Sequence, residues 1–400
     1  MYGRARFSYA RTVTHLPPHF TLLQVTPELE TGGAEQTTID VARAVVKAGG
    51  RALVASRGGR MSHALAETGA KLIEMPVHSK NPLRLFDNAI RLIGVIRNEG
   101  VDIVHARSRA PAFSALWAAK AVGVPFVATY HGVYNARGDL KRWYNSVMTR
   151  GELVIANSNY TRAHVIEEHS IAPEKVVAIA RGVDLTRFDP IKVTERRLAA
   201  LREAWGIERN EPRVKILLAG RLTRWKGQAL LIAAAARLKA SGEKRFLILL
   251  AGDDQGRSAY RAELERAIAQ GGLEDNVRIV GHCEDMPAAY MLADVAAAPS
   301  LDPEAFGRTA VEPQVMGRPV LAANHGAATE TVLNGKTGWL VEPGDPEAWA
   351  RALGKAVRMT PRKRLEMGEA ARQRATGLYS VEAMAAATLA VYARLLDGAR

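Results

Sequence analysis

The chain alternates short aliphatic runs with alanine- and leucine-rich stretches of helical length, and this alternation limits the folds that it can adopt. Strands that alternate with helices form parallel sheets with helices on both faces. The sequence therefore predicts an α/β protein with two doubly wound, Rossmann-like sheets. The predicted strands cover residues 21–26, 52–56, 71–75, 102–106, 126–130, 153–156 and 176–179, and then residues 215–219, 246–251, 277–280, 295–298 and 319–322.

Length and one linker-like segment divide the chain into two parts. Four hundred residues exceed what a single hydrophobic core usually serves. Residues 184–213 contain Pro190, a charged helical stretch and Pro212, directly after which a strand resumes, so they form the best linker. We expect an N-terminal domain over residues 1–190, a C-terminal domain over 191–380 and a final amphipathic helix over 381–400.

Charge and cysteine content narrow the classes of function. Lys and Arg number 55 against 41 Asp and Glu, a net charge of +14, so a nucleic acid, an acidic membrane surface or a phosphorylated substrate is a natural partner. Cys283 is the single cysteine, which excludes an internal disulfide and indicates a reducing compartment. No apolar run approaches the ~18 residues of a membrane span. We expect a cytoplasmic protein, soluble or peripheral on the inner face of the cytoplasmic membrane.

Two loops that follow predicted strands have the composition of phosphate sites. Gly32 and Gly33 precede a helix, where adjacent glycines let a ligand approach the backbone and free amides bind phosphate oxygens. In the second half, Arg221 and Lys226 lie between a strand and the next helix, and two cations there suit a diphosphate. A tight turn at the first loop and a solvated charged loop at the second are the alternatives.

A third loop, residues 299–313, carries two carboxylates. Glu304 follows a predicted strand, and Glu312 lies more than one turn into the helix that Gly307 begins, so both fall on one side of this unit. Carboxylates accept hydrogen bonds from sugar hydroxyls, and free amides around Phe306 and Gly307 add donors. The alternative is a charged surface helix.

Together these motifs resemble the retaining GT-B glycosyltransferases of family 4. Glu304 and Glu312 fit the family's E-x7-E motif, and Arg221 with Lys226 fits its R-x4-K pair. The resemblance covers roughly residues 20–395 and implies the GT-B fold, in which two Rossmann-like domains face a cleft. Its other motifs are Gly32-Gly33-x-Glu35, Asp102-Ile103-Val104-His105, Thr129-Tyr130-His131-Gly132, Val154-Ile155-Ala156-Asn157-Ser158 and Arg181-Gly182-Val183-Asp184.

The resemblance implies a nucleotide-diphosphate-sugar donor, with UDP or GDP as the nucleotide. Arg221 and Lys226 would neutralise the diphosphate, helped by amides near Gly32 and Gly33. Glu312 would bind the ribose, and Glu304 would hold sugar hydroxyls. The other implied donor contacts are the amides of Phe306 and Gly307, His131 beside the sugar, and the loop from His282 to Met286 beside the base.

The family mechanism implies that the acceptor attacks from the side of the leaving group, whose phosphate oxygen takes the acceptor proton. The resulting catalytic set is His131, Arg221, Lys226 and Glu304, with no dedicated base and no cofactor. Scattered histidines and the lack of a D-x-D motif in the sequence favour metal independence. A GT-B epimerase or hydrolase is the alternative activity. A non-enzymatic nucleic-acid-binding protein is favoured by charge alone, and we expect no nucleic-acid partner.

A set of basic residues in the first half lies just past predicted strand ends, where a parallel sheet brings them to one edge. We expect this basic group to recognise an anionic or membrane-embedded acceptor: a lipid-linked saccharide, a lipopolysaccharide core or a glycolipid. The alternative is a generally basic surface, and the sequence does not indicate an oligomeric state. The basic group comprises Arg57, Arg60, Arg107, Arg109, Arg137, Lys141 and Arg142, together with Lys80 and Arg84, and Trp143 and Tyr144 are expected beside it at the level of lipid head groups.

Overall fold

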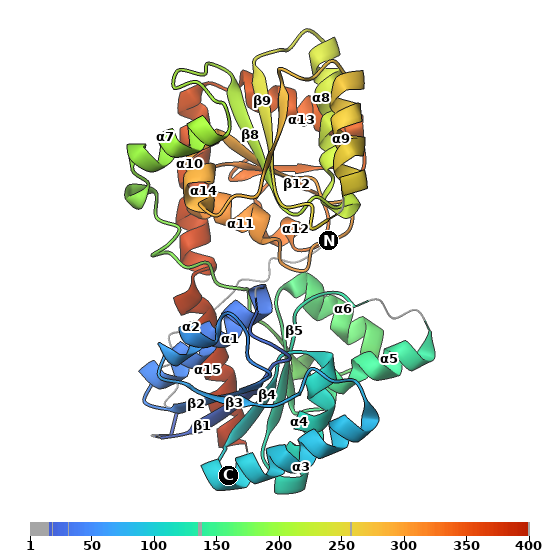
Figure 1. The fold of residues 1–400 in the computed structure, drawn as a ribbon, viewed down its shortest axis with the longest axis vertical. Coiled ribbons are helices and arrows are strands. Elements are labelled where there is room, and N and C mark those ends of the chain that lie inside the picture. The colour runs from blue at the N-terminus through green and yellow to red at the C-terminus, as the bar shows by residue number, and fades with distance from the viewer. Residues whose placement is uncertain (1–15, 18, 31, 135–137, 257, 399–400) are drawn as a thin grey trace. The chain divides into compact units, whose positions relative to one another are not determined.

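The computed structural model describes residues 16–17, 19–30, 32–134, 138–256 and 258–398. It divides into two compact units (Figure 1), the first formed by Met1–Gly182 with Val381–Arg400 and the second by Val183–Ser380. Each unit is built on one parallel sheet. The predicted α/β architecture of two Rossmann-like sheets is confirmed.

The first unit contains a seven-stranded sheet in the order β3-β2-β1-β4-β5-β6-β7. Strands β1, β4, β5 and β6 are buried along their whole length, as expected of parallel strands covered on both faces. The strands are β1 (Thr21–Val25), β2 (Arg51–Ser56), β3 (Lys71–Glu74), β4 (Ile103–Ala106), β5 (Phe126–Tyr130), β6 (Leu153–Ala156) and β7 (Val176–Ala178). The helices are α1 (Gly33–Lys47), α2 (Ser62–Ala66), α3 (Pro82–Glu99), α4 (Arg109–Val122), α5 (Asp139–Asn145), α6 (Asn159–His169) and α15 (Val381–Asp397), with the 3-10 turns η1 (Ser146–Thr149) and η2 (Pro173–Lys175).

The second unit contains a six-stranded sheet in the order β10-β9-β8-β11-β12-β13. Its strands are β8 (Val214–Ala219), β9 (Phe246–Ala251), β10 (Val277–Gly281), β11 (Val295–Ala298), β12 (Val320–Ala323) and β13 (Gly338–Val341). Its helices are α7 (Glu195–Ala204), α8 (Gln228–Ala240), α9 (Ser258–Gln270), α10 (Met286–Leu292), α11 (Arg308–Val315), α12 (Ala328–Thr331), α13 (Pro346–Arg358) and α14 (Pro361–Leu378), with the 3-10 turns η3 (Pro190–Lys192) and η4 (Arg224–Lys226).

Strand β13 was absent from the sequence prediction. It is four residues long and begins with Gly338, a residue that usually weakens a strand. A Cβ at this position would collide with the carbonyl oxygen of Val320 on the neighbouring strand β12. The glycine therefore permits the close approach of the two backbones and does not mark a loop.

Both sheets reverse their strand order at one point, between β1 and β4 in the first and between β8 and β11 in the second. The chain leaves these neighbouring strands toward opposite faces of the sheet, which opens a crevice at their carboxyl ends where α/β proteins bind ligands. In the first unit the loops at this point carry Gly32, Gly33 and Arg107. In the second they are the segments 220–227 and 299–307.

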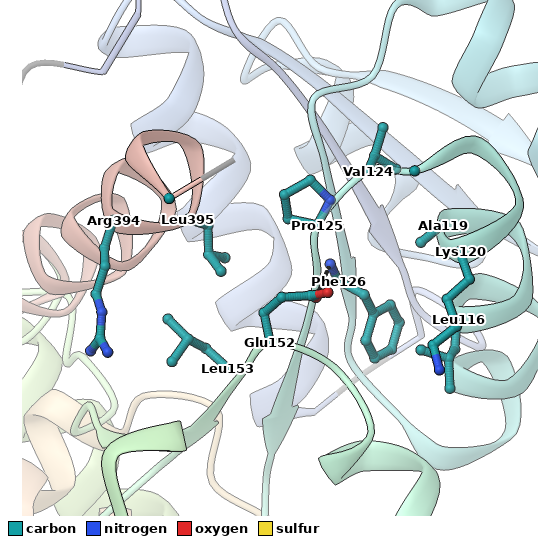
Figure 2. Close-up of a pocket in the computed structure, with 12 residues that line it drawn as sticks. Leu116, Ala119, Lys120, Val124, Pro125, Phe126, Glu152, Leu153, Arg394 and Leu395 are labelled. Atoms are coloured by element: carbon teal, nitrogen blue, oxygen red, sulfur yellow. Dashed lines mark hydrogen bonds between the residues drawn. The ribbon is translucent and has the colours of Figure 1, made fainter. Parts of the chain in front are cut away.

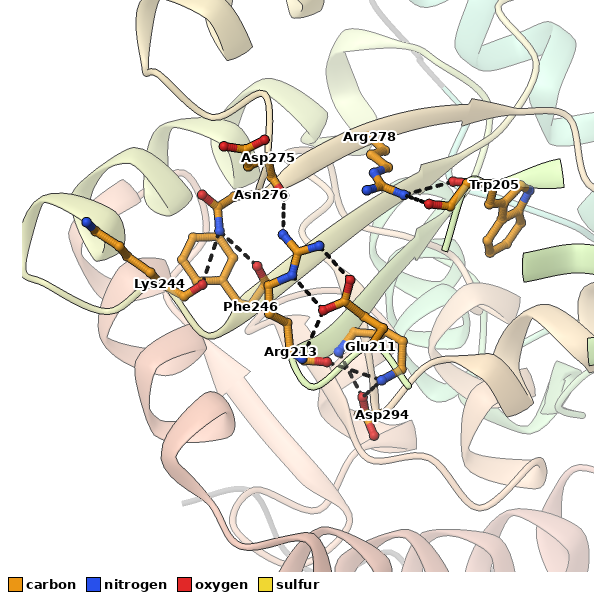
Figure 3. A network of polar contacts seen from close by, with 11 residues as sticks. Trp205, Glu211, Arg213, Lys244, Phe246, Asp275, Asn276, Arg278 and Asp294 are labelled. Carbon is orange, nitrogen blue, oxygen red and sulfur yellow. Dashed lines mark hydrogen bonds and ion pairs between the residues drawn. The ribbon is translucent and has the colours of Figure 1, made fainter. Parts of the chain in front are cut away.

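The amino-terminal edges of both sheets are fixed by contacts of their own. A groove of about 540 Å³ lies beside β5 and β6. There Glu152 accepts a hydrogen bond from the backbone N–H of Phe126 at 2.7 Å, and Figure 2 shows the residues that line the groove. Figure 3 shows a polar network before β8, in which the Arg213 guanidinium lowers the pKa of Glu211 to about 2. Both features lie at the edge opposite the loops that are predicted to bind a ligand.

Two of the expected domain limits need correction. The units divide at Gly182 and not near residue 190, because the following residues pack on the second unit: Phe188 lies against Tyr290, with ring centroids 6.4 Å apart. The segment 381–400, expected as a separate helix, belongs to the first unit. Figure 1 shows α15, in red, beside α1, in blue.

Helix α15 is held to the sheet by a buried polar column. The hydroxyl of Tyr392 lies 2.6 Å from Nδ1 of His105 on β4, whose Nε2 lies 2.7 Å from the hydroxyl of Thr129 on β5. His105 and Tyr392 are fully buried, and burial holds the pKa of His105 well below its usual value. Both ring nitrogens of a neutral histidine are thus satisfied inside the core.

We predict that Tyr392→Phe destabilises the first unit by about 1–3 kcal/mol, because it leaves a buried ring nitrogen of His105 without its partner. The measurement is denaturant unfolding of the full chain. Tyr144→Phe is the control, since the hydroxyl of Tyr144 makes no hydrogen bond to the part of the chain that the structure describes. Equal unfolding midpoints for both variants would contradict the structural role of this column.

Candidate active site

The loops after β8 and β11 are packed directly on each other. The backbone N–H of Leu301 donates to the carbonyl of Trp225 at 2.7 Å. Gly227 has φ +79°, and a Cβ there would collide with the carbonyl oxygen of Pro299. A glycine is therefore required at the start of α8, and the two predicted ligand loops form one surface.

Lys226 and Glu304 meet on this surface. Lys226 Nζ lies 2.8 Å from Glu304 Oε1, and the two side chains are only 11% and 17% exposed. The hydroxyl of Ser300 donates to the same carboxylate oxygen at 2.5 Å, and the ammonium group lies 4.4 Å from the centroid of the Trp225 ring. The pair is therefore held from several sides, and a phosphate that binds Lys226 competes with Glu304 for it.

Arg221 differs from Lys226 in its surroundings. Its side chain is exposed and makes no ion pair with the described residues. Its backbone is fixed, because its carbonyl accepts a hydrogen bond from Gln228 Nε2 at 2.9 Å. The backbone of Arg221 is thus held at the end of β8, while its guanidinium has no ion-pair partner among the described residues. A guanidinium can bind two oxygens of one anion.

The backbone around Glu304 is held by the loop after β12. The carbonyl of Glu304 accepts from the N–H of Ala327 at 2.9 Å, and Gly326, at φ +58°, lies against it without room for a Cβ. Gly307, at φ +77°, caps the N-terminus of α11. Phe306 is buried and packs edge-to-face on Tyr379, so only its backbone remains for the expected ligand contact.

Glu312 is buried within the second unit. Arg308 Nε donates to one of its carboxylate oxygens at 2.8 Å, and the hydroxyl of Tyr290 donates to the other at 3.2 Å. Burial and the charge of Glu312 raise the pKa of Tyr290 well above its usual value, so the phenol stays protonated. A ribose hydroxyl would have to share this carboxylate with both donors.

His282 and Met286 bracket the loop after β10. His282 is exposed, and Met286 begins α10. Between them Asp285 caps this helix by accepting from the N–H of Ala288 and pairs with Arg197 at 2.5 Å. The hydrogen bond from Arg197 lowers the pKa of Asp285. The loop expected to flank the base is therefore anchored by Asp285 to α7.

In the first unit the Gly32-Gly33 turn opens α1 and lies beside Arg181. A Cβ on Gly33 would collide with the Arg181 guanidinium, which donates from Nη2 to Nδ1 of His131 at 3.2 Å. Asn157 fixes the same residue by donating from Nδ2 to the carbonyl of His131 at 3.0 Å. His131 at the end of β5 and the glycine turn after β1 are thus joined through Arg181.

This contact determines the protonation of His131. A guanidinium is only a donor, so Nδ1 of His131 is the acceptor and Nε2 carries the proton. Burial, together with the charges of Arg181 and Arg107, holds the pKa of His131 well below its usual value. Nε2 is buried and has no hydrogen-bond partner among the described residues. His131 therefore offers a neutral N–H donor, and it is neither a cation nor a base.

The residues of the basic group lie in different surroundings. Arg107 is 2% exposed and donates to Gln24 Oε1 from Nε at 2.8 Å, so its place on a surface patch is wrong. Arg57 pairs with Glu28, Arg60 with Glu30, and Arg142 with Glu168. Arg109 lies over the ring of Tyr134, and Lys141 is exposed. Arg137 lies outside the described residues.

Sequence reasoning missed His325, which follows β12. Its two ring nitrogens are buried without a hydrogen-bond partner among the described residues. It lines a small cavity together with Ser300, Glu304 and Thr309. A search of the positions just after the strands, which located the other residues, would have found it, because β12 ends at Ala323.

No group of three or more His, Cys, Asp or Glu side chains within the described ranges has the arrangement of a metal site. The polar groups at the reversal point of the second sheet are instead two cations, two carboxylates and a helix N-terminus. Such groups bind the phosphates and hydroxyls of a ligand directly.

Known proteins share both units. Residues 31–187 match the sequence profile described as Glycosyltransferase Family 4, and residues 201–374 match that of Glycosyl transferases group 1. A D-inositol 3-phosphate glycosyltransferase from Xylanimonas cellulosilytica is 32% identical over 74% of this chain and 73% of that protein. For four other curated proteins of this name the match spans 53% to 66% of their length.

Solved structures agree with these matches. A glycosyltransferase from Rickettsia africae is 35% identical, with a TM-score of 0.86, over 94% of this chain and 99% of that one. Anabaena Alr3699/HepE, solved with UDP-glucose, is 25% identical, with a TM-score of 0.77, over 93% and 100%. The chain is thus an α/β protein of the GT-B type. It belongs to the family 4 glycosyltransferases, also described as group 1.

We predict that nitrogen NMR of the His131 ring finds Nε2 protonated and Nδ1 unprotonated, and that the ring stays neutral where a free histidine titrates, because burial and the neighbouring arginines lower its pKa. Arg181→Met removes the donor at Nδ1, so a mixture of tautomers is expected in that variant. Arg150→Met, a change at an exposed arginine of the same unit, is the control. A wild-type signal from a protonated Nδ1 would contradict the assignment.

Proposed function

We propose that the protein transfers a sugar from a nucleotide-diphosphate-sugar, a UDP- or GDP-sugar, to an acceptor with retention of anomeric configuration. The observation that carries this proposal is the Lys226–Glu304 pair beside Arg221, at the reversal point of the second sheet. It joins phosphate-binding cations to a sugar-binding carboxylate within one surface. Family membership and the structure of a relative solved with UDP-glucose support the same donor class.

Breaking the bond between the sugar and the diphosphate leaves negative charge on the phosphate and positive charge on the anomeric carbon. Arg221 and Lys226 stabilise the first, as cations whose attraction for the phosphate is strongest when this charge develops. Transfer of Lys226 from Glu304 to the phosphate frees that carboxylate for sugar hydroxyls. The phosphate oxygen of the leaving group takes the acceptor proton, so we assign no separate base, no cofactor and no metal.

The family resemblance supplies the remaining assignments. In this proposal the Nε2–H of His131 donates to a sugar oxygen, and the amides at Gly32 and Gly33 approach the diphosphate. Glu312 binds the ribose. The amides of Phe306 and Gly307 bind sugar hydroxyls, and the loop from His282 to Met286 flanks the base.

For the acceptor we propose a lipid-linked saccharide, a lipopolysaccharide core or a glycolipid, reached by peripheral contact with an anionic membrane inside the cell. The net charge of +14 and the exposed Lys141 support an anionic partner. The curated relatives are named for D-inositol 3-phosphate, which is an anionic compound. Among the described residues, no helix has both the length and the apolar character needed to cross a bilayer.

We predict that Arg221→Ala and Lys226→Ala each lower turnover by ~10²–10³, the usual loss when one group that stabilises transition-state charge is removed. The measurement is release of nucleoside diphosphate from a series of UDP- and GDP-sugars. Arg224→Ala is the matched control, because Arg224 lies in the same loop but pairs with Glu263. Wild-type turnover in both site variants would remove the proposed diphosphate contact.

We also predict that transfer continues in excess EDTA and that the product keeps the anomeric configuration of the donor, as read by NMR. The first follows because cationic side chains stabilise the leaving diphosphate in this proposal, and the second because the acceptor attacks from the side of the leaving group. Loss of activity in EDTA with recovery on adding Mg²⁺ or Mn²⁺ would refute the first expectation. An inverted product would refute the second.

A further inference from the structure

Helix α3 exposes a row of large apolar side chains. Leu83 is 82% exposed, Phe86 64% and Ile90 55%. Their spacing over residues 83, 86 and 90 places them on one face of the helix, while Leu85, Ala89 and Leu92 are buried on the other. The exposed row is therefore additional to the residues that attach α3 to its unit.

The local sequence makes α3 a well-defined helix. Asn81 caps its start by accepting from the N–H of Leu83 at 2.9 Å, Pro82 occupies the first turn, and Gly100 ends it in the left-handed region at φ +58°. Because both ends of α3 are capped, the helix does not need its exposed apolar side chains in order to form.

Two neighbouring helices extend this apolar surface. Helix α4 packs on α3 (Figure 1), and Ser114 on α4 donates to the carbonyl of Leu85 at 2.8 Å. The ring of Phe113 on α4 lies 6.1 Å from that of Trp117 and 5.7 Å from that of Trp143 on α5. We name the resulting surface the α3–α5 face. It comprises Leu83, Phe86, Ile90, Trp117, Leu140 and Trp143, all of them exposed.

The same three helices carry unpaired cations. Arg84 and Arg97 on α3, Lys120 on α4 and Lys141 on α5 are exposed and make no ion pair with the described residues. The acidic side chains of these helices are engaged: Asp87 pairs with Arg91, Asp139 with Arg142, and Glu99 with Arg51 and Lys71. An apolar row with tryptophans and unpaired cations matches the interface of an anionic bilayer.

We propose that the α3–α5 face is the surface by which this protein docks on an anionic lipid bilayer. The apolar row enters the boundary between head groups and acyl chains, the two tryptophans lie at the level of the head groups, and the four unpaired cations face anionic lipids. This deepens the membrane contact under the proposed function by naming its residues, of which Arg84, Lys141 and Trp143 were expected from the sequence.

The test is sedimentation of the full chain with vesicles of phosphatidylcholine alone or with added phosphatidylglycerol. The variant Leu83→Ser/Phe86→Ser/Ile90→Ser should bind anionic vesicles at least tenfold more weakly than wild type. The matched control Ile191→Ser/Leu365→Ser, which removes exposed apolar side chains of the second unit, should bind as wild type does. Arg84→Ala/Lys141→Ala should weaken binding and lessen its salt dependence.

Equal binding by the α3 variant and wild type, or absence of wild-type binding to anionic vesicles, overturns the proposal. The proposal is also overturned if wild type does not bind vesicles but self-associates, and if the α3 variant abolishes this self-association. That outcome assigns the α3–α5 face to a second copy of the chain. The unfolding midpoint of each variant, expected to equal that of wild type, establishes that lost binding is not lost folding. Release of nucleoside diphosphate in solution tests the proposed activity separately, since the variant residues take no part in it.

Discussion

The reversal of strand order in each sheet is the constraint from which the candidate active site follows. Between β8 and β11 the chain leaves two adjacent strands toward opposite faces, and their loops can meet only at the shared carboxyl edge. That edge joins Lys226 to Glu304 although 78 positions separate them in the chain. The glycines at 227 and 326 let the backbones approach closely enough for the contact.

The pairing of Lys226 with Glu304 also explains how two largely buried charged side chains are tolerated before a ligand binds. A lone buried ammonium or carboxylate would pay a large desolvation cost, whereas a pair with further hydrogen bonds is tolerated. Ser300 supplies one such bond and the Trp225 ring a second contact. A ligand with both phosphate and hydroxyl groups can bind Lys226 through the phosphate and Glu304 through a hydroxyl. A ligand with only one kind of group leaves either Lys226 or Glu304 without a partner.

Much of this arrangement could be predicted from the sequence, because it depends on local patterns. Aliphatic runs located twelve of the strands, and the positions just past strand ends located Arg221, Lys226 and Glu304. Side-chain environments could not be predicted in this way. Arg107 has the same strand-end position as Arg221, yet it is buried on Gln24 and Arg221 is exposed. Likewise the role of Arg181 in fixing His131 depends on a contact between segments 50 positions apart.

The assignment of α15 to the first unit has a consequence for how the chain is connected. The second unit is an insertion within the first, and its ends meet: the N–H of Val183 donates to the carbonyl of Tyr379 at 2.7 Å, and Val183 forms a bridge with Ser380. Its two ends are therefore adjacent, and all six strands of its sheet have been synthesised before the chain returns to the first unit. The first unit begins earlier on the ribosome, but its buried His105 acquires Tyr392 only when translation has passed the whole inserted unit, so the part made first is completed last.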